Sequence, residues 1–203
     1  MQPLWIGSNN KKKRAELERI LLPLGIALRT PDQLGQPYEP VEDQPDFAGN
    51  ARKKAELLAR LAGGVALGDD SGLCVDALGG RPGVLSARYG GPGLDDRGRL
   101  LRLLDEMRDV PPPRRTAHFV CSLCVCGPDG RVLAAIEERC LGTLLPAPAG
   151  EGGFGYDPIF VPLEFAGDAG HTFAALDAAT KDRLSHRGKA LRALASALPG
   201  LLR

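Results

Sequence analysis

The sequence lacks any long hydrophobic run and any excess of one charge. Among its 203 residues, no segment approaches the roughly 18 consecutive apolar residues that a membrane-spanning helix needs. The start, MQPLWIGSNNKKK, passes from a short apolar stretch into basic residues without a small-residue cleavage site, unlike a secretory signal. The 26 Lys and Arg nearly balance the 25 Asp and Glu, which gives no broad attraction to nucleic acid or to an anionic membrane. We expect a soluble, cytoplasmic protein with neither of these partners.

Cysteine is scarce, and its number is odd. Five cysteines in a chain of this length favour reduced thiols over a disulfide framework. Cys121, Cys124 and Cys126 lie close together after His118, which raises the alternative of a zinc site. The run HFVCSLCVCG is typical of a strand, where alternate side chains face opposite ways, so Cys121 should face away from the other two. We therefore expect buried structural cysteines rather than a metal centre.

Segments typical of strands and helices alternate along the chain. A chain that is 43% hydrophobic can bury roughly 70% of its unfolded surface at this length, which predicts one domain over residues 1–203. Apolar periodicity and flanking breakers predict strands at 3–6, 25–29 and 63–69, helices at 11–22, 46–62, 95–107 and 188–198, and a β-hairpin across 118–142. This order predicts an α/β fold with one antiparallel hairpin.

Two adjacent carboxylates lie at the end of the third predicted strand, in the stretch GDDSG. Ionised Asp69 and Asp70 repel each other and resist burial, so the pair costs stability unless a positive group meets it. A turn is the simpler alternative, because Asp-Ser-Gly is favourable turn chemistry.

The junction after the first predicted strand, GSNNKKKRAE, carries the opposite charge. Ser8, Asn9 and Asn10 are good helix caps, yet residues 11–14 of the first turn are all basic. Cations are unfavourable at a helix N-terminus unless an anion lies over it, and phosphate is the obvious anion; the alternative is a solvated basic face. If the two strands are parallel, this junction and the acid pair meet at one sheet edge. A triphosphate with Mg²⁺ would find its cations and its metal-binding carboxylates there.

Two later segments carry further candidate binding residues. In GEGGFGYDPIF, glycines surround Phe154, whose ring can stack on a nucleobase, and Asp157 offers acceptors; the alternative is a tight loop with the ring tucked inward. In KDRLSHRGKAL, Lys181, His186 and Arg187 gather donors just before the last predicted helix, where they could form a binding cluster or an ordinary surface.

These segments, in this order, resemble the inosine triphosphate pyrophosphatase family. The resemblance spans about residues 6–194 and rests on SNNKKKRAE, FAGNARKKA, GDDSGLCVDALGGRPGVLSARYGG, GEGGFGYDPIF and TFAAL followed by KDRLSHRGKAL. It implies a homodimer, an elongated mixed β-sheet flanked by helices, and two lobes around a central cleft. It also implies hydrolysis of dITP, ITP and XTP at the α-phosphorus, with Mg²⁺, to the nucleoside monophosphate and pyrophosphate.

The resemblance also assigns roles to the matching residues. Asp70 becomes the catalytic carboxylate and a metal ligand. The segment from Ser8 to Lys13 contacts the triphosphate, and the loop from Phe154 to Asp157 contacts the base. The full set of implied substrate-binding residues is Ser8, Asn9, Asn10, Lys11, Lys12, Lys13, Ser71, Phe154, Gly155, Tyr156, Asp157, Lys181, His186 and Arg187.

Two family carboxylates are missing from the matching motifs. Gly49 stands where the family usually has Glu, and Ala175 replaces the Glu of TFAEL. Glu42 or Asp43, in the preceding loop, could take their place; we choose Glu42, which is the better aligned, as a metal ligand beside Asp70. The alternatives are a nucleotide-binding or nucleotide-hydrolysing α/β protein without 6-oxopurine preference, and a phosphatase that forms an aspartyl phosphate. The latter needs DxDx[TV], which GDDSG does not supply.

Overall fold

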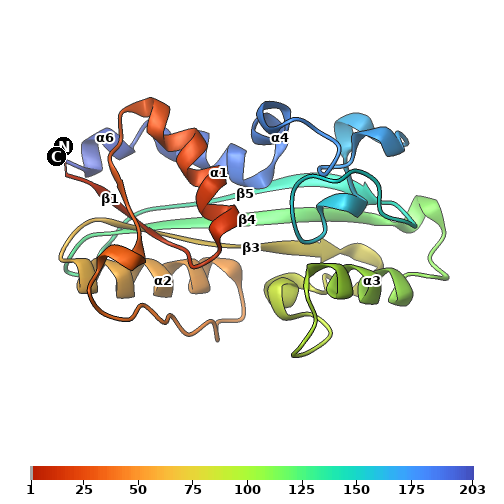
Figure 1. The fold of residues 1–203 in the computed structure, drawn as a ribbon, viewed down its shortest axis with the longest axis horizontal. Coiled ribbons are helices and arrows are strands. Elements are labelled where there is room, and N and C mark those ends of the chain that lie inside the picture. Colours follow the sequence, from red (N-terminus) through yellow and green to blue (C-terminus); the bar gives the residue numbers. More distant parts are fainter. Residues whose placement is uncertain (1) are drawn as a thin grey trace. The chain divides into compact units, whose positions relative to one another are not determined.

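The computed structural model describes residues 2–203 and contains one mixed β-sheet of six strands in the order β2-β1-β3-β4-β5-β6 (Figure 1). The strands are β1 (Leu4–Gly7), β2 (Leu28–Arg29), β3 (Ala66–Val75), β4 (Thr116–Cys126), β5 (Val132–Leu144) and β6 (Phe160–Pro162). β1 is parallel to β2 and to β3, whereas β5 and β6 are antiparallel. Residues 127–131 join β4 to its neighbour β5, and so short a link requires an antiparallel pair. The predicted α/β fold with one hairpin is confirmed.

Helices lie on both faces of the sheet. They are α1 (Lys11–Leu21), α2 (Phe47–Ala62), α3 (Asp96–Glu106), α4 (Ala178–Leu184), α5 (His186–Ala195) and α6 (Leu198–Leu201). The first three match the predicted helices to within about one residue. The last helix was predicted over 188–198, whereas α5 begins at His186 and ends at Ala195, and the short α6 begins at Leu198. Pro199 has no backbone N–H to donate to the Ala195 carbonyl oxygen, and its ring would clash with that carbonyl group. The sequence did not predict α4 or β6, which are both short.

The chain divides into two compact units. The first unit contains the residues up to Asp70, together with Cys121–Glu138 and Arg187–Arg203. Its sheet strands are covered on one face by α1, α5 and α6 and on the other by α2 (Figure 1). The apolar cluster on the first face includes Leu17 and Leu191, and the cluster on the second includes Ala55 and Leu58. This burial fixes the orientation of α1, α2 and α5 about the strands.

The second unit contains Ser71–Val120 and Arg139–His186. Its core includes three phenylalanine rings, of which Phe119 packs edge to face on Phe160 at 4.7 Å between ring centroids. Phe160 in turn packs on Phe173 at 4.9 Å. Large aromatic side chains contribute much of the burial in such a core. The glycine-rich loop 150–157 begins and ends against this core, since Ala149 donates to Pro158 and Ile159 donates to Tyr156.

The acid pair lies within a strand, and the turn weighed for GDDSG is wrong. β3 is longer than the predicted strand 63–69 and continues through Asp69 and Asp70 to Val75. Helix α2 packs directly on this strand at Gly68, where an added Cβ would come within 2.0 Å of the Ala51 carbonyl oxygen. The buried carboxylates persist in the strand because cations from other elements meet them, as described below.

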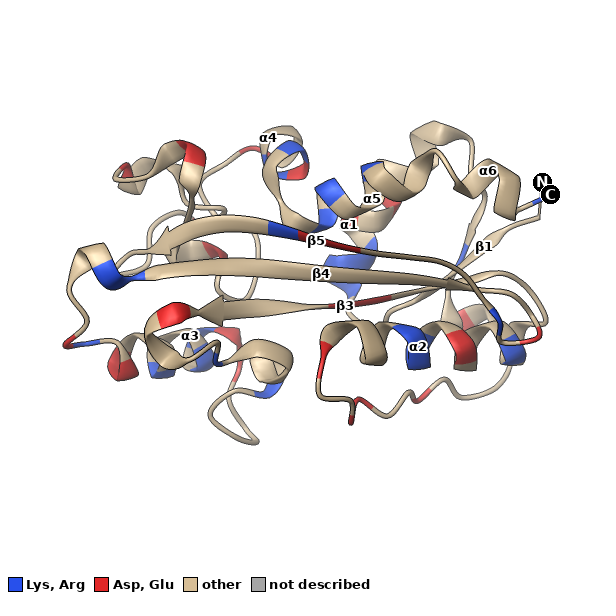
Figure 2. Ribbon diagram, turned by 180° about the vertical axis from the view of Figure 1, so that it is seen from behind, with Lys and Arg blue, Asp and Glu red and all other residues tan. Residues whose placement is uncertain are grey.

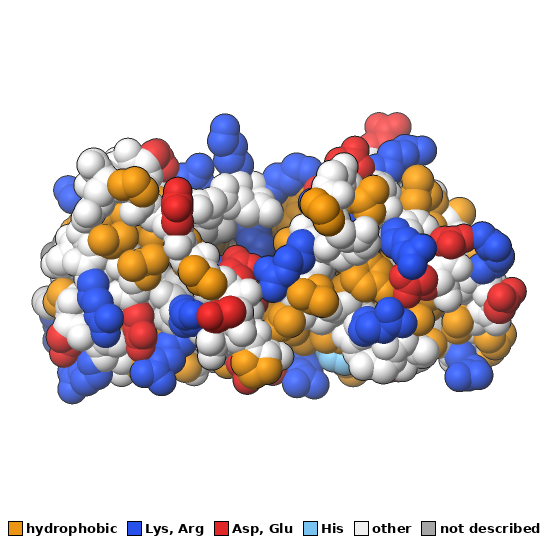
Figure 3. All heavy atoms as spheres, turned by 90° about the horizontal axis from the view of Figure 1, so that it is seen from below, with side chains coloured by type: hydrophobic (Ala, Val, Ile, Leu, Met, Phe, Trp, Pro, Cys, Tyr) orange, Lys and Arg blue, Asp and Glu red, His pale blue; other side chains and the backbone are white. Residues whose placement is uncertain are grey.

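The cysteine pattern follows the alternation of the strand. Cys121 belongs to the apolar cluster under α1 and α5, whereas Cys124 and Cys126 belong to the cluster under α2, as predicted. Within residues 2–203, no helix is long and apolar enough to cross a membrane, and no three His, Cys, Asp or Glu side chains are grouped as metal ligands. On the face drawn in Figure 3, acidic, basic and hydrophobic side chains are mixed, and neither charge forms a continuous patch.

Candidate active site

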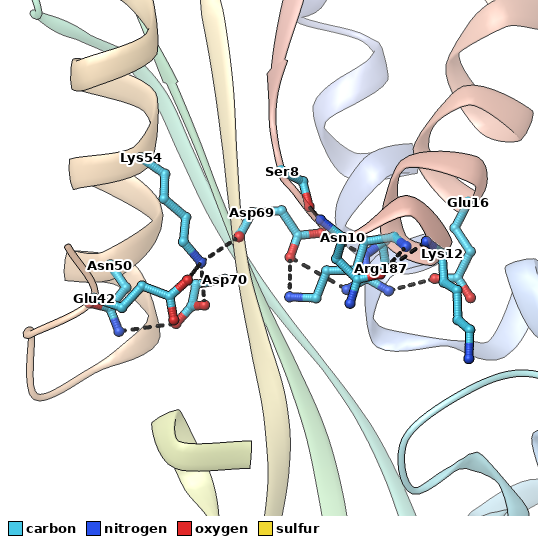
Figure 4. A network of polar contacts seen from close by, with 11 residues as sticks. Ser8, Asn10, Lys12, Glu16, Glu42, Asn50, Lys54, Asp69, Asp70 and Arg187 are labelled. Atoms are coloured by element: carbon cyan, nitrogen blue, oxygen red, sulfur yellow. Dashed lines mark hydrogen bonds and ion pairs between the residues drawn. The ribbon is translucent and has the colours of Figure 1, made fainter. Parts of the chain in front are cut away.

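The two carboxylates of β3 point to opposite faces of the sheet, because they are successive residues of a strand. Figure 4 shows Asp69 directed toward Arg187 and the start of α1, and Asp70 directed toward Lys54 and Asn50 of α2. The acidic segment of β3 and the basic start of α1 are also visible in Figure 2. Each carboxylate is therefore met by a different helix of the first unit.

Asp69 is held by two cations. Its carboxylate accepts from Arg187 Nε at 2.6 Å and from Lys13 Nζ at 3.2 Å, and Asp69 and Arg187 are each only 2% exposed. Arg187 also donates to Glu16 of α1, so one buried guanidinium joins two carboxylates. Burial alone would raise the pKa of Asp69, but the charges of Arg187 and Lys13 outweigh it and hold this pKa well below its usual range. Asp69 is thus a permanently ionised structural anion.

Asp70 has a different environment. Lys54 Nζ lies 2.7 Å from Asp70 Oδ1, and Asn50 Nδ2 donates to Asp70 Oδ2 at 3.2 Å. Burial raises the pKa of Asp70, and the charges of Lys54 and Lys13 offset only part of that rise. The two neighbouring acids therefore differ in basicity, and Asp70 is the one suited to accept a proton.

Glu42 lies in the same cluster as Asp70. Its Oε1 lies 2.7 Å from Lys54 Nζ, so Lys54 lies between Glu42 and Asp70. The carboxylate oxygens of Glu42 and Asp70 are the kind of ligand that fits Mg²⁺, which proteins usually bind with one or two carboxylates together with substrate phosphates. At Gly49, where the family usually has Glu, an added Cβ would come within 2.8 Å of Gln44 Cβ. A side chain at position 49 thus requires Gln44 to move.

Lys54 was missed by the sequence reasoning, although a signal was present. Asn50 and Lys54 are four residues apart on α2 and so share one face of the helix. That face also carries Ala51, Ala55 and Leu58, which are buried. Polar residues on an apolar helix face need partners, and this pattern indicates a buried polar site.

The junction between β1 and α1 lies beside the acid pair. Gly7 pairs with Gly68 in the parallel register, so Ser8 follows β1 where Asp69 continues β3. Asn10 caps α1 and accepts from the backbone nitrogens of Lys12 and Lys13 at 2.9 and 3.2 Å. Ser8 is buried and accepts from Asn10 N at 3.3 Å. Asn9 donates to the Tyr38 carbonyl oxygen, and residues 9–12 are exposed.

The glycine-rich loop of the second unit is organised by Asp157. Its Oδ2 accepts from Phe154 N at 2.8 Å and from Lys181 Nζ at 2.7 Å. Gly153 has a φ of 68°, and a Cβ there would lie 2.2 Å from Asp157 Oδ2, so glycine is required on both counts. Lys181 Nζ lies 4.9 Å from the centroid of the Phe154 ring, which is half-buried. The ring is neither fully exposed nor tucked into the core.

The remaining predicted residues of this unit lie as follows. Tyr156 is buried, and its hydroxyl donates to the Ser86 carbonyl oxygen at 3.0 Å. Gly155 donates to Asp96 at 3.2 Å. His186 is buried with its ring stacked on Phe119 at 4.7 Å. Ser71 is half-buried on β3, directly after Asp70.

The structure therefore brings the predicted residues together in two groups, one in each unit. The first group surrounds the acid pair and contains Ser8, Asn9, Asn10, Lys11, Lys12, Lys13, Glu42, Asp70 and Arg187. The second group centres on the Asp157–Lys181 ion pair and contains Phe154, Gly155, Tyr156, Asp157 and Lys181, while Ser71 and His186 belong to the same unit.

Known proteins resemble this chain over almost its full length. A family model described as the Ham1 family matches residues 4–197. A dITP/XTP pyrophosphatase of Corynebacterium efficiens is 48% identical, with 98% of each chain covered. Another, of Mycolicibacterium paratuberculosis, is 43% identical, with 100% of this chain and 98% of the relative covered.

Solved structures give the same result. A HAM1 protein from Coxiella burnetii is 33% identical, with a TM-score of 0.84 and coverage of 98% of this chain and 100% of the other. A nucleoside-triphosphatase/dITP/XTP pyrophosphatase from Mycobacterium abscessus is 41% identical, with a TM-score of 0.74 and coverage of 95% and 97%. These matches confirm the resemblance seen in the sequence motifs. The chain belongs to the Ham1 family.

Proposed function

We propose that this protein hydrolyses the noncanonical purine nucleoside triphosphates dITP, ITP and XTP to the monophosphate and pyrophosphate, and so clears them from the nucleotide pool. The full-length relatives named as dITP/XTP pyrophosphatases support this reaction. The observation that carries it is Asp70 beside Lys54 and Glu42, on the strand that pairs with β1, and β1 leads into the lysine-rich start of α1. This arrangement combines a proton-accepting carboxylate with cations for phosphate.

In the proposed reaction, Asp70 orients and deprotonates the attacking water. Its raised pKa brings it closer to the basicity that favours proton transfer at neutral pH. Asn50 and Lys54 fix the orientation of the carboxylate through its two oxygens. Asp70 and Glu42 would hold Mg²⁺, which would neutralise charge on the phosphate oxygens.

The triphosphate is assigned to the start of α1. Lys11 and Lys12 are exposed there, and Lys13 reaches the carboxylate of Asp69. Ser8, Asn9 and Asn10 supply polar side chains at the same junction. If these residues bind the outer phosphates as a unit, water enters at the α-phosphorus and pyrophosphate leaves whole.

The base is assigned to the glycine-rich loop of the second unit. The half-buried ring of Phe154 offers a stacking surface, and the backbone around Gly155 and Tyr156 offers donors and acceptors. Asp157 and Lys181 hold this loop in place. Ser71, His186 and Arg187 complete the proposed substrate contacts. Arg187 is held by Asp69 and Glu16, so a ligand would share its guanidinium with these two carboxylates.

We further propose that residues 1–203 act as one catalytic domain, with Mg²⁺ as the cofactor, as a homodimer in the cytoplasm. These assignments rest on the family resemblance and on the oxygen-donor cluster at Asp70 and Glu42. Chelation of divalent metal with EDTA should abolish activity, and added Mg²⁺ should restore it.

The reaction is tested directly with ITP and Mg²⁺ in ¹⁸O-labelled water. The proposal expects the label in the nucleoside monophosphate and unlabelled pyrophosphate as the only other product. Label in pyrophosphate, or release of orthophosphate with a diphosphate product, would instead indicate a stepwise phosphatase.

A further inference from the structure

A groove of about 500 Å³ lies in the second unit, between α3 and the segment that follows β5. Leu101 and Leu104 of α3 line one side, and residues 146–148, Pro-Ala-Pro, line the other. This volume is within the range of roughly 300–1,000 Å³ that is typical of small-molecule sites. None of the lining residues belongs to the set assigned above to the nucleotide or the metal.

Arg115 lines the same groove and is only 4% exposed. Its Nε and Nη1 atoms donate to the carbonyl oxygens of Leu144, Met107 and Val110, and its Nη2 donates to that of Leu145 at 3.1 Å. A guanidinium has five N–H groups, so one N–H on Nη2 remains after these four bonds. Within residues 2–203, no carboxylate pairs with Arg115 in the structure.

A buried cation without a counter-ion is unusual, because dipoles of carbonyl groups compensate a full charge only in part. The other charged side chains of the groove are Asp105 and Arg108, which pair with each other and are 51% and 74% exposed. The lining therefore carries two cations against one anion. The net charge of the groove is therefore positive. Of its three charged side chains, only Arg115 is buried.

We propose that this groove binds a small organic carboxylate with an apolar body. The ligand carboxylate accepts a hydrogen bond from the remaining N–H on Nη2 of Arg115 and neutralises the charge of this buried guanidinium. The apolar body lies between Leu101, Leu104 and the Pro-Ala-Pro segment. The ligand must therefore carry a negative charge that reaches Arg115 and an apolar part small enough to fit between the two walls of the groove.

The proposal is tested with octanoate and octan-1-ol as matched probes, because they share a chain length and differ in charge. The full-length protein is titrated with each probe and followed by ¹H–¹⁵N NMR. Octanoate should give saturable shifts at the Leu101 and Leu104 amides and at the Arg115 side-chain Nε–H. Octan-1-ol should bind at least about 10-fold more weakly, since hydrogen bonds to charged groups are the stronger ones. Equal affinities, or no saturable shift in the groove, would overturn the proposal.

Two substitutions locate the site. Leu101→Asp places a negative charge in the groove at a side chain that is 47% exposed, so the fold should persist. Leu163→Asp makes the same change at a side chain that is 54% exposed and does not line the groove. Octanoate affinity should fall at least about 10-fold in the first variant and stay unchanged in the second. Unchanged binding in Leu101→Asp contradicts the proposal. So does a change of molecular mass in solution in that variant alone, which would assign the groove to a second copy of the chain.

Discussion

The ammonium group of Lys54 lies 2.7 Å from the carboxylate of Asp70, and both side chains are buried. Burial would lower the pKa of Lys54, but the charges of Asp70 and Glu42 outweigh it and raise this pKa, so the lysine stays protonated. A fixed cation at this place keeps Asp70 ionised and oriented even though burial opposes its charge.

Replacement of Lys54 tests this role. Lys54→Met should lower kcat with ITP by about 100-fold or more, because Asp70 loses its orienting cation, an effect of the size seen for groups that assist proton transfer. Lys53→Met is the matched control, since Lys53 is adjacent but pairs with Asp43 at the surface. It should keep kcat within about threefold. Similar kcat values for the two variants would contradict the assignment.

The Asp69–Arg187 pair should also contribute to stability, apart from the proposed substrate contact of Arg187. Arg187→Leu leaves two buried carboxylates, Asp69 and Glu16, without their shared cation, and removal of one partner of a buried pair costs about 3–5 kcal/mol. Urea unfolding of the variant measures this loss. Arg192→Leu changes an exposed arginine on the same helix and should cost less than about 1 kcal/mol. Equal unfolding free energies for the two variants would be incompatible with this role.

The glycine-rich loop offers a comparison between two glycines. Gly153→Ala and Gly167→Ala both place a side chain at positive φ, at a similar cost of about 1–2 kcal/mol. Only at Gly153 would the new Cβ displace Asp157 Oδ2, whereas nothing lies within 4 Å at Gly167. Gly153→Ala should therefore lower kcat/KM for ITP by about 10-fold or more, with Gly167→Ala close to wild type. An equal loss in Gly167→Ala would show that backbone strain, and not Asp157, determines the effect.

The pKa of Asp70 can be measured in metal-free protein by ¹³C NMR of its carboxyl group. Burial raises this pKa, so the midpoint should lie above the ordinary value of about 3.9. Because the folded state then binds the proton more tightly than the unfolded state, the contribution of Asp70 to stability falls as the pH rises through this window. Glu42→Gln removes a neighbouring negative charge that raises the pKa, and the midpoint should move down. A midpoint at or below about 3.9 in the wild type would refute the stated environment.

Local patterns predicted the parts of the fold that depend on neighbouring residues. Asp46 caps α2 by accepting from Gly49 N at 2.7 Å, and period-two alternation places Cys121 opposite Cys124 and Cys126. The continuation of β3 from Asp70 to Val75 could not be predicted in this way. The partners of Asp69, Lys13 and Arg187, are 56 and 118 residues away, and without them two adjacent acids favour a turn. Ion pairs with residues distant in the sequence determine whether such an acid pair lies in a strand or in a turn, and a local sequence pattern cannot reveal these partners.

The residues of the candidate site were selected because their types are characteristic of the chemistry, and their roles remain predictions. The acid pair and the start of α1 were selected from their charge and position, whereas Asp70 and Glu42 were selected as metal ligands from the family resemblance. In the structure Lys54 links Glu42 to Asp70, and the start of α1 follows the neighbouring strand. The partners that hold them were not selected. Glu16 lies on a helix where single polar residues are common, and only the three-dimensional structure shows that it is buried against the site. Asn50 and Lys54 share an apolar helix face, a signal that was not used.

The central claim is tested most directly by kcat/KM for ITP and for ATP in the wild type and in Asp70→Asn. Hypoxanthine presents a 6-oxo acceptor and an N1–H donor, whereas adenine presents the reverse pattern, and such a mismatch is worth on the order of a thousandfold in kcat/KM. We predict that kcat/KM of the wild type is on the order of a thousandfold higher for ITP than for ATP. For Asp70→Asn we predict a fall of about 100- to 10,000-fold in kcat with the fold intact. Comparable values for ITP and ATP, or near wild-type kcat in a folded Asp70→Asn variant at saturating Mg²⁺, would contradict the account.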